Sequence, residues 1–426
     1  MNATVTSEPT TPVTMVRPIV EIDGDEMARV MMHSIRENLV RPHVALDLLY
    51  FDLSVTNRDA TQDAVTHEAI DALVSAKVAV KCATITADRA KAREFGLRHL
   101  LPSPNATIRR RLDGVDFREP ILAEGIAPFV RGWDEPIVIA RHAHADQYLA
   151  QDLRVEEAGT ASLVFHPAAG GPDVVREIGT FPSSGGVLLG MYNYIESIES
   201  FATSCFEMAL SRLMPVCLST KSTVLQSYDG AFVEAFDRVF AADYQAAFAA
   251  AGLRYEHRLI DDVVAYSVRS HGGFIWACKN YDGDVQSDFV AQGFGSPGMM
   301  RATLVSSREA TMLFEAPHGT IPRHFRRHRR GFPTSSNPVA SIFAWSGALR
   351  ERGRQDGSEP LCGVADAIER ATLDTIASGT VTGDLAAVRD QSDSATTDEF
   401  IAAVSQRVGL LLSARARSPI SSGRRN

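Results

Sequence analysis

Two aspartates, four residues apart, carry the strongest chemical signal in the chain. Asp284 and Asp288 lie in the segment Asp282-Gly-Asp-Val-Gln-Ser-Asp288, and on a helix they would project from one face. Two carboxylates this close repel each other unless a cation lies between them, and Mg²⁺ prefers carboxylate oxygens. The pair therefore indicates a metal site, or else solvated acids at a helix N-terminus, where the helix dipole stabilises them.

Two other acidic segments need separate interpretations. Asp261, in Leu259-Ile-Asp-Asp262, is either a further metal ligand or a helix cap. The segment Asp23-Gly-Asp25 resembles the later acidic pair, but it has no second aspartate at helical spacing. We expect it to form a turn and a helix N-cap.

Three arginines each lie near the end of a short motif. Arg109, Arg118 and Arg141 follow or belong to Ser-Pro-Asn-Ala-Thr-Ile, Phe-Arg-Glu-Pro and Ala-Arg-His. The planar guanidinium matches a carboxylate in bidentate fashion. If the three converge they would suit a polyanionic substrate, and if they do not they are surface arginines.

The remaining candidates are an acid/base pair and a phosphate loop. Tyr148 and Lys221 could exchange protons with a substrate, because burial near charges moves such pKa values toward working pH. The segment His318-Gly-Thr320, followed by Arg323-His324, combines backbone donors, a hydroxyl and cations. Such a loop can bind a nucleotide phosphate, although the basic run 323–330 could also be a solvated face.

The elements that would position these residues alternate between strand and helix along the chain. Strand-like runs are expected at 18–22, 44–53, 78–83, 274–278 and 302–314, and helices at 25–39, 66–76, 195–213 and 232–250. Short β-type runs at 162–166, 174–178 and 186–189 indicate a small β-rich insertion. This pattern predicts an α/β sheet covered by helices, with a discontinuous large domain, a smaller domain and an inserted clasp. The sequence has neither a Walker A loop nor a Gly-x-Gly-x-x-Gly after a strand, so a classical Rossmann motif is not expected.

Length and composition narrow the class of protein. The 426 residues suggest about two domains, and a net charge of -9 gives no overall support for a nucleic-acid partner. We find no apolar run long enough for a membrane helix and no secretory signal. The five scattered cysteines form no Cys-x-x-Cys pair. We therefore expect a cytoplasmic protein with neither membrane nor nucleic-acid partners.

Over residues 18–411 the chain resembles the homodimeric NADP-dependent isocitrate dehydrogenases, within the isocitrate/isopropylmalate dehydrogenase family. The resemblance is carried by the motifs at 23–27, 57–61, 80–86, 103–109, 218–221, 255–262, 272–288, 318–320 and 341–345. Phe-Ile-Trp-Ala-Cys-Lys-Asn-Tyr-Asp-Gly-Asp-Val-Gln-Ser-Asp at 274–288 is its longest block.

The resemblance implies a shared dimer site and assigns the candidates to it. Mg²⁺ or Mn²⁺ would be held by Asp284 and Asp288 of one subunit and by Asp261 of the other. Tyr148 would act in its own subunit, whereas Lys221 would reach across the interface. A small hydroxy acid, isocitrate, would contact Thr86, Ser103, Asn105, Arg109, Arg118 and Arg141. NADP would use Lys81, Thr84, Ile85, Thr86, Arg269, Gly319, Thr320, Ile321, Pro322, Arg323, His324 and Asn337.

The implied fold has a large domain at 1–112 and 295–426, a small domain at 113–145 and 195–294, and a dimer-forming clasp at 146–194. The implied reaction is oxidation of isocitrate followed by decarboxylation to 2-oxoglutarate and CO₂. Arg323 and His324 would favour NADP over NAD.

Several positions depart from the family pattern, and they leave the metal and acid/base groups intact. They are Lys91, Ala106, His144, Ala145, Tyr266, Pro317 and Ser336. An added methyl in a tight pocket changes fit by about 1–3 kcal/mol, so these positions leave an alternative open. In it, the enzyme is a biosynthetic paralogue that oxidatively decarboxylates an isocitrate analogue, such as a phosphonomethylmalate, and Arg110 and Arg111 would suit its extra charge.

Overall fold

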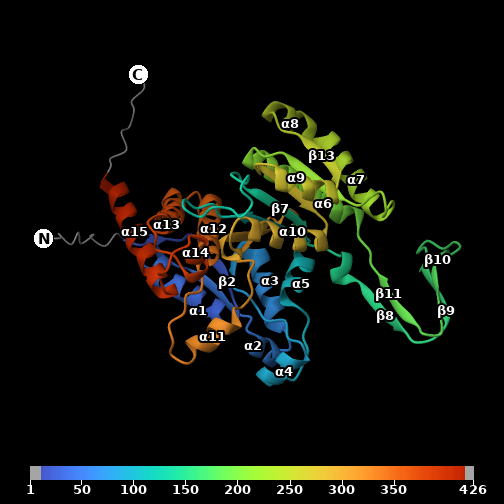
Figure 1. Ribbon diagram of the computed structural model, residues 1–426, viewed down its shortest axis with the longest axis horizontal. Helices are drawn as coiled ribbons and strands as arrows, with labels where there is room; N and C mark the ends of the chain where they lie inside the picture. The colour runs from blue at the N-terminus through green and yellow to red at the C-terminus, as the bar shows by residue number, and fades with distance from the viewer. Residues whose placement is uncertain (1–10, 418–426) are drawn as a thin grey trace.

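One mixed sheet organises the protein. The computed structural model describes residues 11–417, and within them ten strands pair in the order β13-β12-β14-β7-β6-β15-β16-β5-β2-β4 (Figure 1). Their bounds are, in that order, Tyr255–Leu259, Val216–Thr220, Phe274–Cys278, Ile137–His142, Val115–Pro120, Met300–Ser306, Thr311–Glu315, Val78–Lys81, Ile19–Asp23 and Leu48–Asp52. A short parallel pair, β1 (Val13–Thr14) with β3 (Val44–Ala45), lies outside it.

Helices connect most of these strands. Their bounds are α1 Glu26–Ile35, α2 Val55–Ala60, α3 Ala64–Ala76, α4 Arg89–Phe95, α5 Pro104–Leu112, α6 Ile195–Arg212, α7 Tyr228–Val239, α8 Gln245–Ala251, α9 Ile260–Arg269, α10 Asn280–Gly293, α11 Pro322–His328, α12 Val339–Asp356, α13 Glu359–Ala377, α14 Gly383–Val388 and α15 Thr397–Arg417. Shorter helical turns are η1 Arg36–Val40, η2 Asp146–Leu149, η3 Phe240–Tyr244 and η4 Pro297–Met299. Within residues 11–417, no helix combines the length and apolarity needed to cross a bilayer.

The predicted α/β class is confirmed, and the centre of the sheet differs from its ends. The outer strands pair in parallel, whereas β7, β6, β15 and β16 pair antiparallel. The predicted strand at 302–314 is in fact the hairpin β15–β16, and the one at 44–53 is split into β3 and β4. The predicted helix at 232–250 is divided into α7, η3 and α8. The β6–β15 pair joins the two predicted domains into one sheet, so their boundaries stay a prediction.

Alternation along the strands divides the core between the two faces. Val138 and Ala140 of β7 pack with α6 and α7, whereas Ile137 and Ile139 pack with α9 and α10. In the other half, Val80 of β5 packs with α12 and α13, whereas Ala79 packs with α3 and α5. Successive strand residues point to opposite faces, so α3, α5, α9 and α10 share one face, and α6, α12 and α13 the other.

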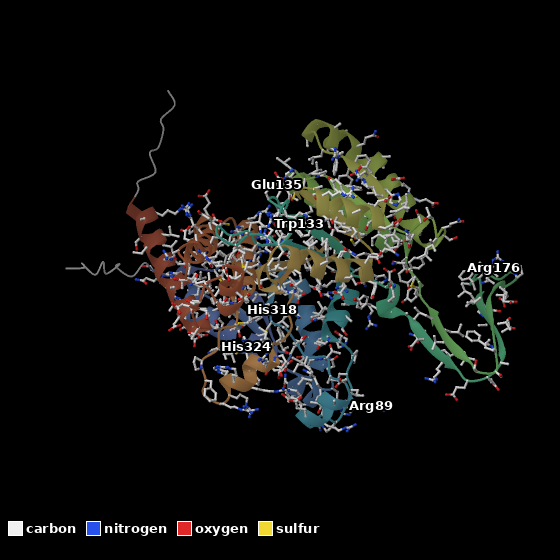
Figure 2. The ribbon with its side chains drawn as sticks, viewed as in Figure 1. Arg89, Trp133, Glu135, Arg176, His318 and His324 are labelled. Atoms are coloured by element: carbon white, nitrogen blue, oxygen red, sulfur yellow. The ribbon has the colours of Figure 1, made fainter. Side chains whose placement is uncertain are left out.

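The predicted β-rich insertion forms an arm. β8 (Gln151–Val155) pairs antiparallel with β11 (Gly186–Gly190), and β9 (Gly159–Phe165) pairs with β10 (Val174–Phe181). Figure 1 shows the arm projecting from the body on the side opposite to α15, and Arg176 lies near its tip (Figure 2). Apolar side chains on both strand pairs remain exposed, among them Leu153, Leu163, Phe165 and Val187.

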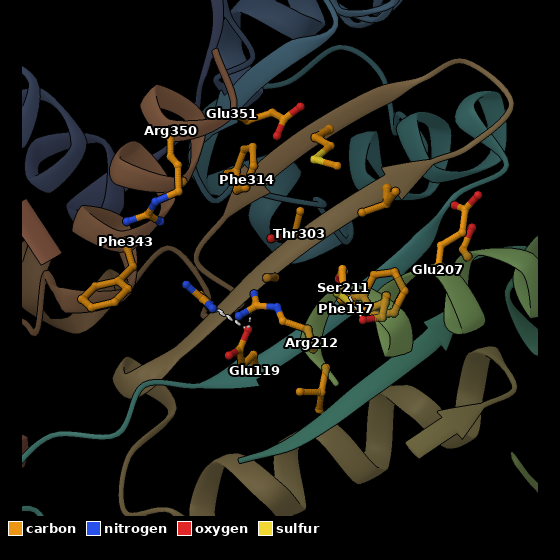
Figure 3. A pocket seen from close by; sticks show the side chains of 18 of the residues that line it. Phe117, Glu119, Glu207, Ser211, Arg212, Thr303, Phe314, Phe343, Arg350 and Glu351 are labelled. Carbon is orange, nitrogen blue, oxygen red and sulfur yellow. Dashed lines mark hydrogen bonds and ion pairs between the residues drawn. The ribbon is translucent and has the colours of Figure 1, made fainter. Parts of the chain in front are cut away.

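A pocket of about 750 Å³ lies on the face of the sheet that carries α6 and α12. Its floor is formed by β6, β15 and β16, and Figure 3 shows the charged side chains at its edge. Glu119 accepts hydrogen bonds from Arg212 of α6 (3.1 Å) and Arg301 of β15 (2.6 Å). Glu369 accepts a hydrogen bond from Arg350 (2.8 Å). The two bonds of Glu119 link α6 and β6 to β15 across the β6–β15 pair, whereas the Arg350–Glu369 pair joins α12 to α13.

His142 ends β7 in a fully buried position and carries a pH-dependent contribution to stability. Its ring stacks on Phe201 with centroids 5.0 Å apart, and Nε2 lies 2.8 Å from the hydroxyl of Ser197. Burial, together with His144, lowers the pKa of His142 from 6.5 to about 3, against the opposing effect of Asp113. The folded state therefore holds this ring neutral while the unfolded chain becomes protonated below pH 6.5. Its contribution is fully present above pH 6.5 and declines as the pH falls toward 3.

Replacing His142 with Phe is expected to flatten this dependence. The free energy of unfolding of the wild type should fall relative to that of the variant between pH 6.5 and 4.5, approaching about 1.4 kcal/mol per pH unit. Urea unfolding at three pH values in that range measures the difference. His166→Phe, at an exposed histidine on the arm, is the matched control and should track the wild type. Parallel curves for wild type and His142→Phe would contradict the prediction.

Candidate active site

Asp284 is the centre of a cluster of predicted site residues. It lies on α10 one turn before Asp288, as the spacing predicted. Its carboxylate accepts hydrogen bonds from Arg141 of β7 and from the hydroxyl of Tyr148 (2.5 Å), and Arg118 lies 3.4 Å away. Burial raises the pKa of the Asp284 carboxyl, but Arg141 and its neighbours hold it below its ordinary value. Asp284 is therefore a carboxylate, and Asp288 adds a second, exposed one.

The three predicted arginines converge, and two buried acids hold them together. Asp116 of β6 is fully buried and accepts hydrogen bonds from Arg109 and Arg118, both at 3.1 Å. Glu315, at the end of β16, accepts a hydrogen bond from Arg109 (3.3 Å) and pairs with Lys81 (2.9 Å). Our sequence analysis missed both acids. The signal for Asp116 was available, because it lies two residues before Arg118 in a strand and so faces the same side.

Negative charge compensates the arginines unequally: Asp116 and Asp284 raise the pKa of Arg118 against the effect of burial, whereas the pKa of Arg141 is lowered. Burial, followed by the charges of Arg109 and Arg118, lowers the pKa of Arg141 to about 10. Burial alone would raise the pKa of the Asp116 carboxyl, yet Arg118 and Arg109 keep it below its usual range. A cation whose own pKa is depressed by other cations is stabilised by an added anion. The cluster therefore favours an anionic ligand.

Tyr148 is held in place by its own short turn, η2. Arg141 lies over its ring at 4.8 Å from the centroid. Burial and the hydrogen bond to Asp284 raise the pKa of Tyr148 to about 12, so the expected shift toward working pH is wrong. Asp146, also in η2, is buried and accepts hydrogen bonds from Tyr228 (2.5 Å) and from the backbone N–H of Asn280 (3.0 Å). These bonds fix the turn against the start of α10, which aligns Tyr148 with Asp284.

Ala145, immediately before η2, has a backbone conformation that favours glycine. Its φ is 52° and its ψ is -138°, a region in which a Cβ costs about 1–3 kcal/mol. Ala145→Gly is therefore expected to raise the free energy of unfolding by about 1 kcal/mol, measured by chemical denaturation. Ala150→Gly, at an extended position with φ of -66°, should instead lower it by about 0.5–1 kcal/mol. Equal losses in the two variants would argue against strain at Ala145.

Lys221 and Asp261 form a second group, apart from the first. Lys221 follows β12, Asp261 lies in the first turn of α9, and the lysine donates a hydrogen bond to the carboxylate. Lys221 is partly exposed and Asp261 is exposed, and the pKa of Asp261 is lowered, mainly by this hydrogen bond. Within residues 11–417, neither residue has a hydrogen bond or ion pair to the Asp284 cluster. The same part of the chain contains no group of three or more His, Cys, Asp or Glu side chains that could hold a metal ion by itself.

The predicted cofactor residues are divided between a groove, a loop and a distant helix. A groove of about 610 Å³ is lined by Ile321, Arg323, His324 and Asn337, as expected, and Figure 2 shows His318 and His324 on this side of the molecule. The amide of Asn337 donates to Asp384 (2.9 Å), another lining residue that the sequence analysis missed. Gly319 and Thr320 lie in the loop that leads into α11, and Pro322 begins that helix. Arg269 ends α9 and does not line the groove.

The other predicted binding loop runs from Lys81 to Thr86. Asp25 holds it, because its carboxylate accepts the backbone N–H groups of Ile85 (2.8 Å) and Val55 (2.9 Å). Asp25 is the N-cap of α1 by position, as predicted, but its side chain makes no cap hydrogen bond and joins two loops instead. Burial raises the pKa of the Asp25 carboxyl to about 6.

The neighbouring predicted substrate residues lie along the start of α5. The hydroxyl of Ser103 accepts the backbone N–H of Ala106 (3.4 Å) and so caps the helix. Asn105 lies in the first turn, where its side-chain oxygen is 3.4 Å from the hydroxyl of Thr84. Thr86 is exposed. The loop and the helix start therefore lie side by side, next to Arg109 on the same helix.

The residues present fit the two groups that the resemblance implied. Asp284 and Asp288 offer ionised or exposed carboxylate oxygens, the donors that Mg²⁺ and Mn²⁺ take. The groove offers Arg323 and His324 beside backbone amides, which suits a phosphate. One chain supplies both the carboxylates for the metal and the groove for the phosphate. Of the three predicted metal ligands, only Asp284 and Asp288 lie together, on α10.

Known proteins resemble this chain over most of its length. Residues 14–404 match the isocitrate/isopropylmalate dehydrogenase family. NADP isocitrate dehydrogenase 1 of Mycobacterium bovis is 47% identical over 392 residues, which cover 92% of this chain and 96% of that protein. The mitochondrial NADP isocitrate dehydrogenase of Sus scrofa is 50% identical over 372 residues, covering 87% and 88%. For the human mitochondrial protein the identity is also 50%, covering 87% and 82%. The chain belongs to the isocitrate/isopropylmalate dehydrogenase family.

Proposed function

We propose that the protein is an NADP-dependent isocitrate dehydrogenase that oxidises isocitrate and decarboxylates the product to 2-oxoglutarate. The observation that carries the proposal is the convergence of Arg118, Arg141 and Tyr148 on the carboxylate of Asp284. Arg109, Arg118 and Arg141 carry three positive charges, which match a substrate with three carboxylates. Tyr148 lies next to the carboxylate that would bind the metal, which suits a proton donor acting close to the metal.

The arginines bind and orient the substrate. In the proposed pose Arg109, Arg118 and Arg141 pair with substrate carboxylates, and Ser103, Asn105 and Thr86 contact its other end. Asp116 and Glu315 keep the guanidinium groups in place before the substrate arrives, so little reorganisation is needed. The same positive charges stabilise negative charge as it moves from the departing carboxylate to the enolate oxygen.

The protein's remaining groups move protons. Lys221 of the partner subunit, with the partner's Asp261, helps remove the proton from the substrate hydroxyl oxygen, and Tyr148 donates a proton to the carbon that has lost CO₂. Asp284 and Asp288, together with Asp261 of the partner subunit, would hold Mg²⁺ or Mn²⁺. When bound, the metal would supply a Lewis acid for the substrate hydroxyl and keto oxygen, and NADP would supply the hydride acceptor.

A substrate panel tests the proposal. Wild-type protein with Mg²⁺ or Mn²⁺ is offered isocitrate, malate, isopropylmalate and a phosphonomethylmalate, each with NADP and with NAD. The expected result is NADPH formation and CO₂ release with isocitrate at the highest kcat/KM. No reduction of NADP with isocitrate, even at high enzyme concentration, would overturn the proposal.

A second candidate is the paralogue that acts on an isocitrate analogue. It is favoured by the departures beside the site: Ala145 occupies a conformation suited to glycine, and the ring of His144 lies near Asp113 (3.7 Å) and Tyr194. Arg111 does not favour it, because this arginine faces Glu309 (3.6 Å) and is half exposed. Preferential turnover of the phosphonate over isocitrate would establish this candidate.

We also propose that the active unit is a homodimer with shared sites, in the cytoplasm. The exposed apolar side chains of the arm suit an interface with a second copy, and the exposed Lys221–Asp261 pair suits completion of the partner's site. None of the five cysteines, all in the described part of the chain, forms a disulfide, which suits a reducing compartment.

Mixing two inactive variants tests the shared sites. Lys221→Met and Asp284→Asn dimers are each expected to be inactive. After dissociation and reassociation, half of the dimers are mixed and each contains one intact site, so about a quarter of wild-type activity should return. No recovery, with mixed dimers verified by mass spectrometry, would place Lys221 and Asp284 in the same subunit's site.

A further inference from the structure

Two arginines of α11 face the cofactor groove one helical turn apart. Arg323 and Arg327 lie four positions apart in α11, and both line the groove. Side chains at this spacing are neighbours on a helix surface, with Cβ atoms about 5–6 Å apart. Only Arg323 was assigned to the cofactor by the sequence analysis, so Arg327 is an additional cation in the same place.

Neither arginine is neutralised by the protein. Within residues 11–417, no ion pair is formed by Arg323 or Arg327, whereas the intervening Arg326 pairs with Glu94 of α4 (3.4 Å). Two like charges at this spacing destabilise a helix by a few tenths of a kcal/mol. The free protein therefore leaves two adjacent guanidinium groups without a counter-ion at the wall of a groove.

The charges of Arg323 and Arg327 both affect His324, which lines the same groove. Its Nδ1 lies 2.7 Å from the hydroxyl of Ser336, which is also a lining residue. Burial lowers the pKa of the His324 ring, and Arg323 and then Arg327 lower it further, against a weaker opposing effect of Asp384. The imidazole is neutral at physiological pH, so the positive charge at this end of the groove comes from the two arginines.

We infer that Arg327, together with Arg323, forms a two-arginine clamp for the ribose 2′-phosphate of NADP, which makes Arg327 a determinant of cofactor specificity. This rests on the proposed function. A phosphate monoester carries nearly two negative charges and three acceptor oxygens, enough for two guanidinium groups at once. The 2′-hydroxyl of NAD carries no charge, so the two arginines form no ion pair with it and do not strengthen NAD binding.

Equilibrium binding tests the clamp without relying on turnover. NADPH, NADH and adenosine 2′,5′-bisphosphate are titrated into the wild-type protein and into Arg327→Gln, by calorimetry at two salt concentrations. The expected result is that Arg327→Gln weakens NADPH and the bisphosphate about tenfold and leaves NADH within about twofold. Arg327→Lys, which keeps the charge without the bidentate fork, should lie between the two.

Arg329→Gln is the matched control, because it removes the same charge from an exposed position that does not line the groove. It should bind all three ligands like the wild type. The clamp is overturned if Arg327→Gln binds the bisphosphate as tightly as the wild type, if it weakens NADH equally, or if Arg329→Gln matches it. A wild type that binds NADH as tightly as NADPH would overturn the proposed NADP dependence itself.

Discussion

Asp284→Asn is expected to reduce kcat by about 10³-fold or more, while the protein stays folded. The carboxylate accepts bonds from Arg141 and Tyr148, and in the proposed reaction it also holds the metal. The amide keeps the shape but loses the charge that attracts a divalent cation, and its NH₂ group would face an arginine. Steady-state kinetics over a range of Mn²⁺ concentrations measures the loss.

The control for this variant is Asp262→Asn, which removes an exposed carboxylate from α9 beside the proposed ligand Asp261. It should retain nearly all activity. Size-exclusion chromatography and thermal unfolding should find Asp284→Asn as well folded as the wild type, because its side chain is partly exposed. Normal turnover of Asp284→Asn would exclude it from metal binding.

The largest expected effect on stability is that of Asp116→Asn. This change leaves Arg109 and Arg118 without their shared buried counter-ion, and removing one partner of a buried ion pair costs about 3–5 kcal/mol. The loss is measured as the free energy of unfolding in urea at neutral pH. Saturating isocitrate should restore part of it, because substrate carboxylates would pair with the same arginines.

Asp366→Asn is the comparison for this prediction, since Asp366 makes an exposed pair with Arg350 (3.0 Å). Such pairs contribute about 0–1 kcal/mol, so the variant should unfold almost like the wild type. A loss below about 1 kcal/mol in Asp116→Asn would show that the arginines do not depend on this carboxylate.

The sequence was sufficient for residues whose spacing is local. The four-residue interval between Asp284 and Asp288 implied one helix face, and both lie on α10. The convergence of Arg118 and Arg141 depends on β6 and β7 being neighbours in the sheet. Local pattern does not specify which strands pair, so that part came from the family resemblance.

Other features were beyond prediction because they depend on contacts between distant segments. Glu315 lies one residue beyond the strand expected at 302–314, and only the pairing of β16 with β5 brings it to Lys81. Asp25 looked like a helix cap, yet its oxygens bond Val55 and Ile85. The partition of the candidates between the Asp284 cluster and the Lys221–Asp261 pair requires the fold, and the shared site itself remains a proposal.

The pocket behind the sheet places a second set of charges one residue away from the proposed substrate site. Arg118 of β6 points toward Asp284, and the next residue, Glu119, points into the pocket and joins Arg212 to Arg301. The two surfaces are therefore separated by the thickness of one strand, and any twist of β6 moves both. We expect that substitutions at Glu119 will alter the affinity for substrate, although Glu119 does not contact the substrate. Relatives with the same catalytic residues can therefore differ in affinity through changes on this rear surface.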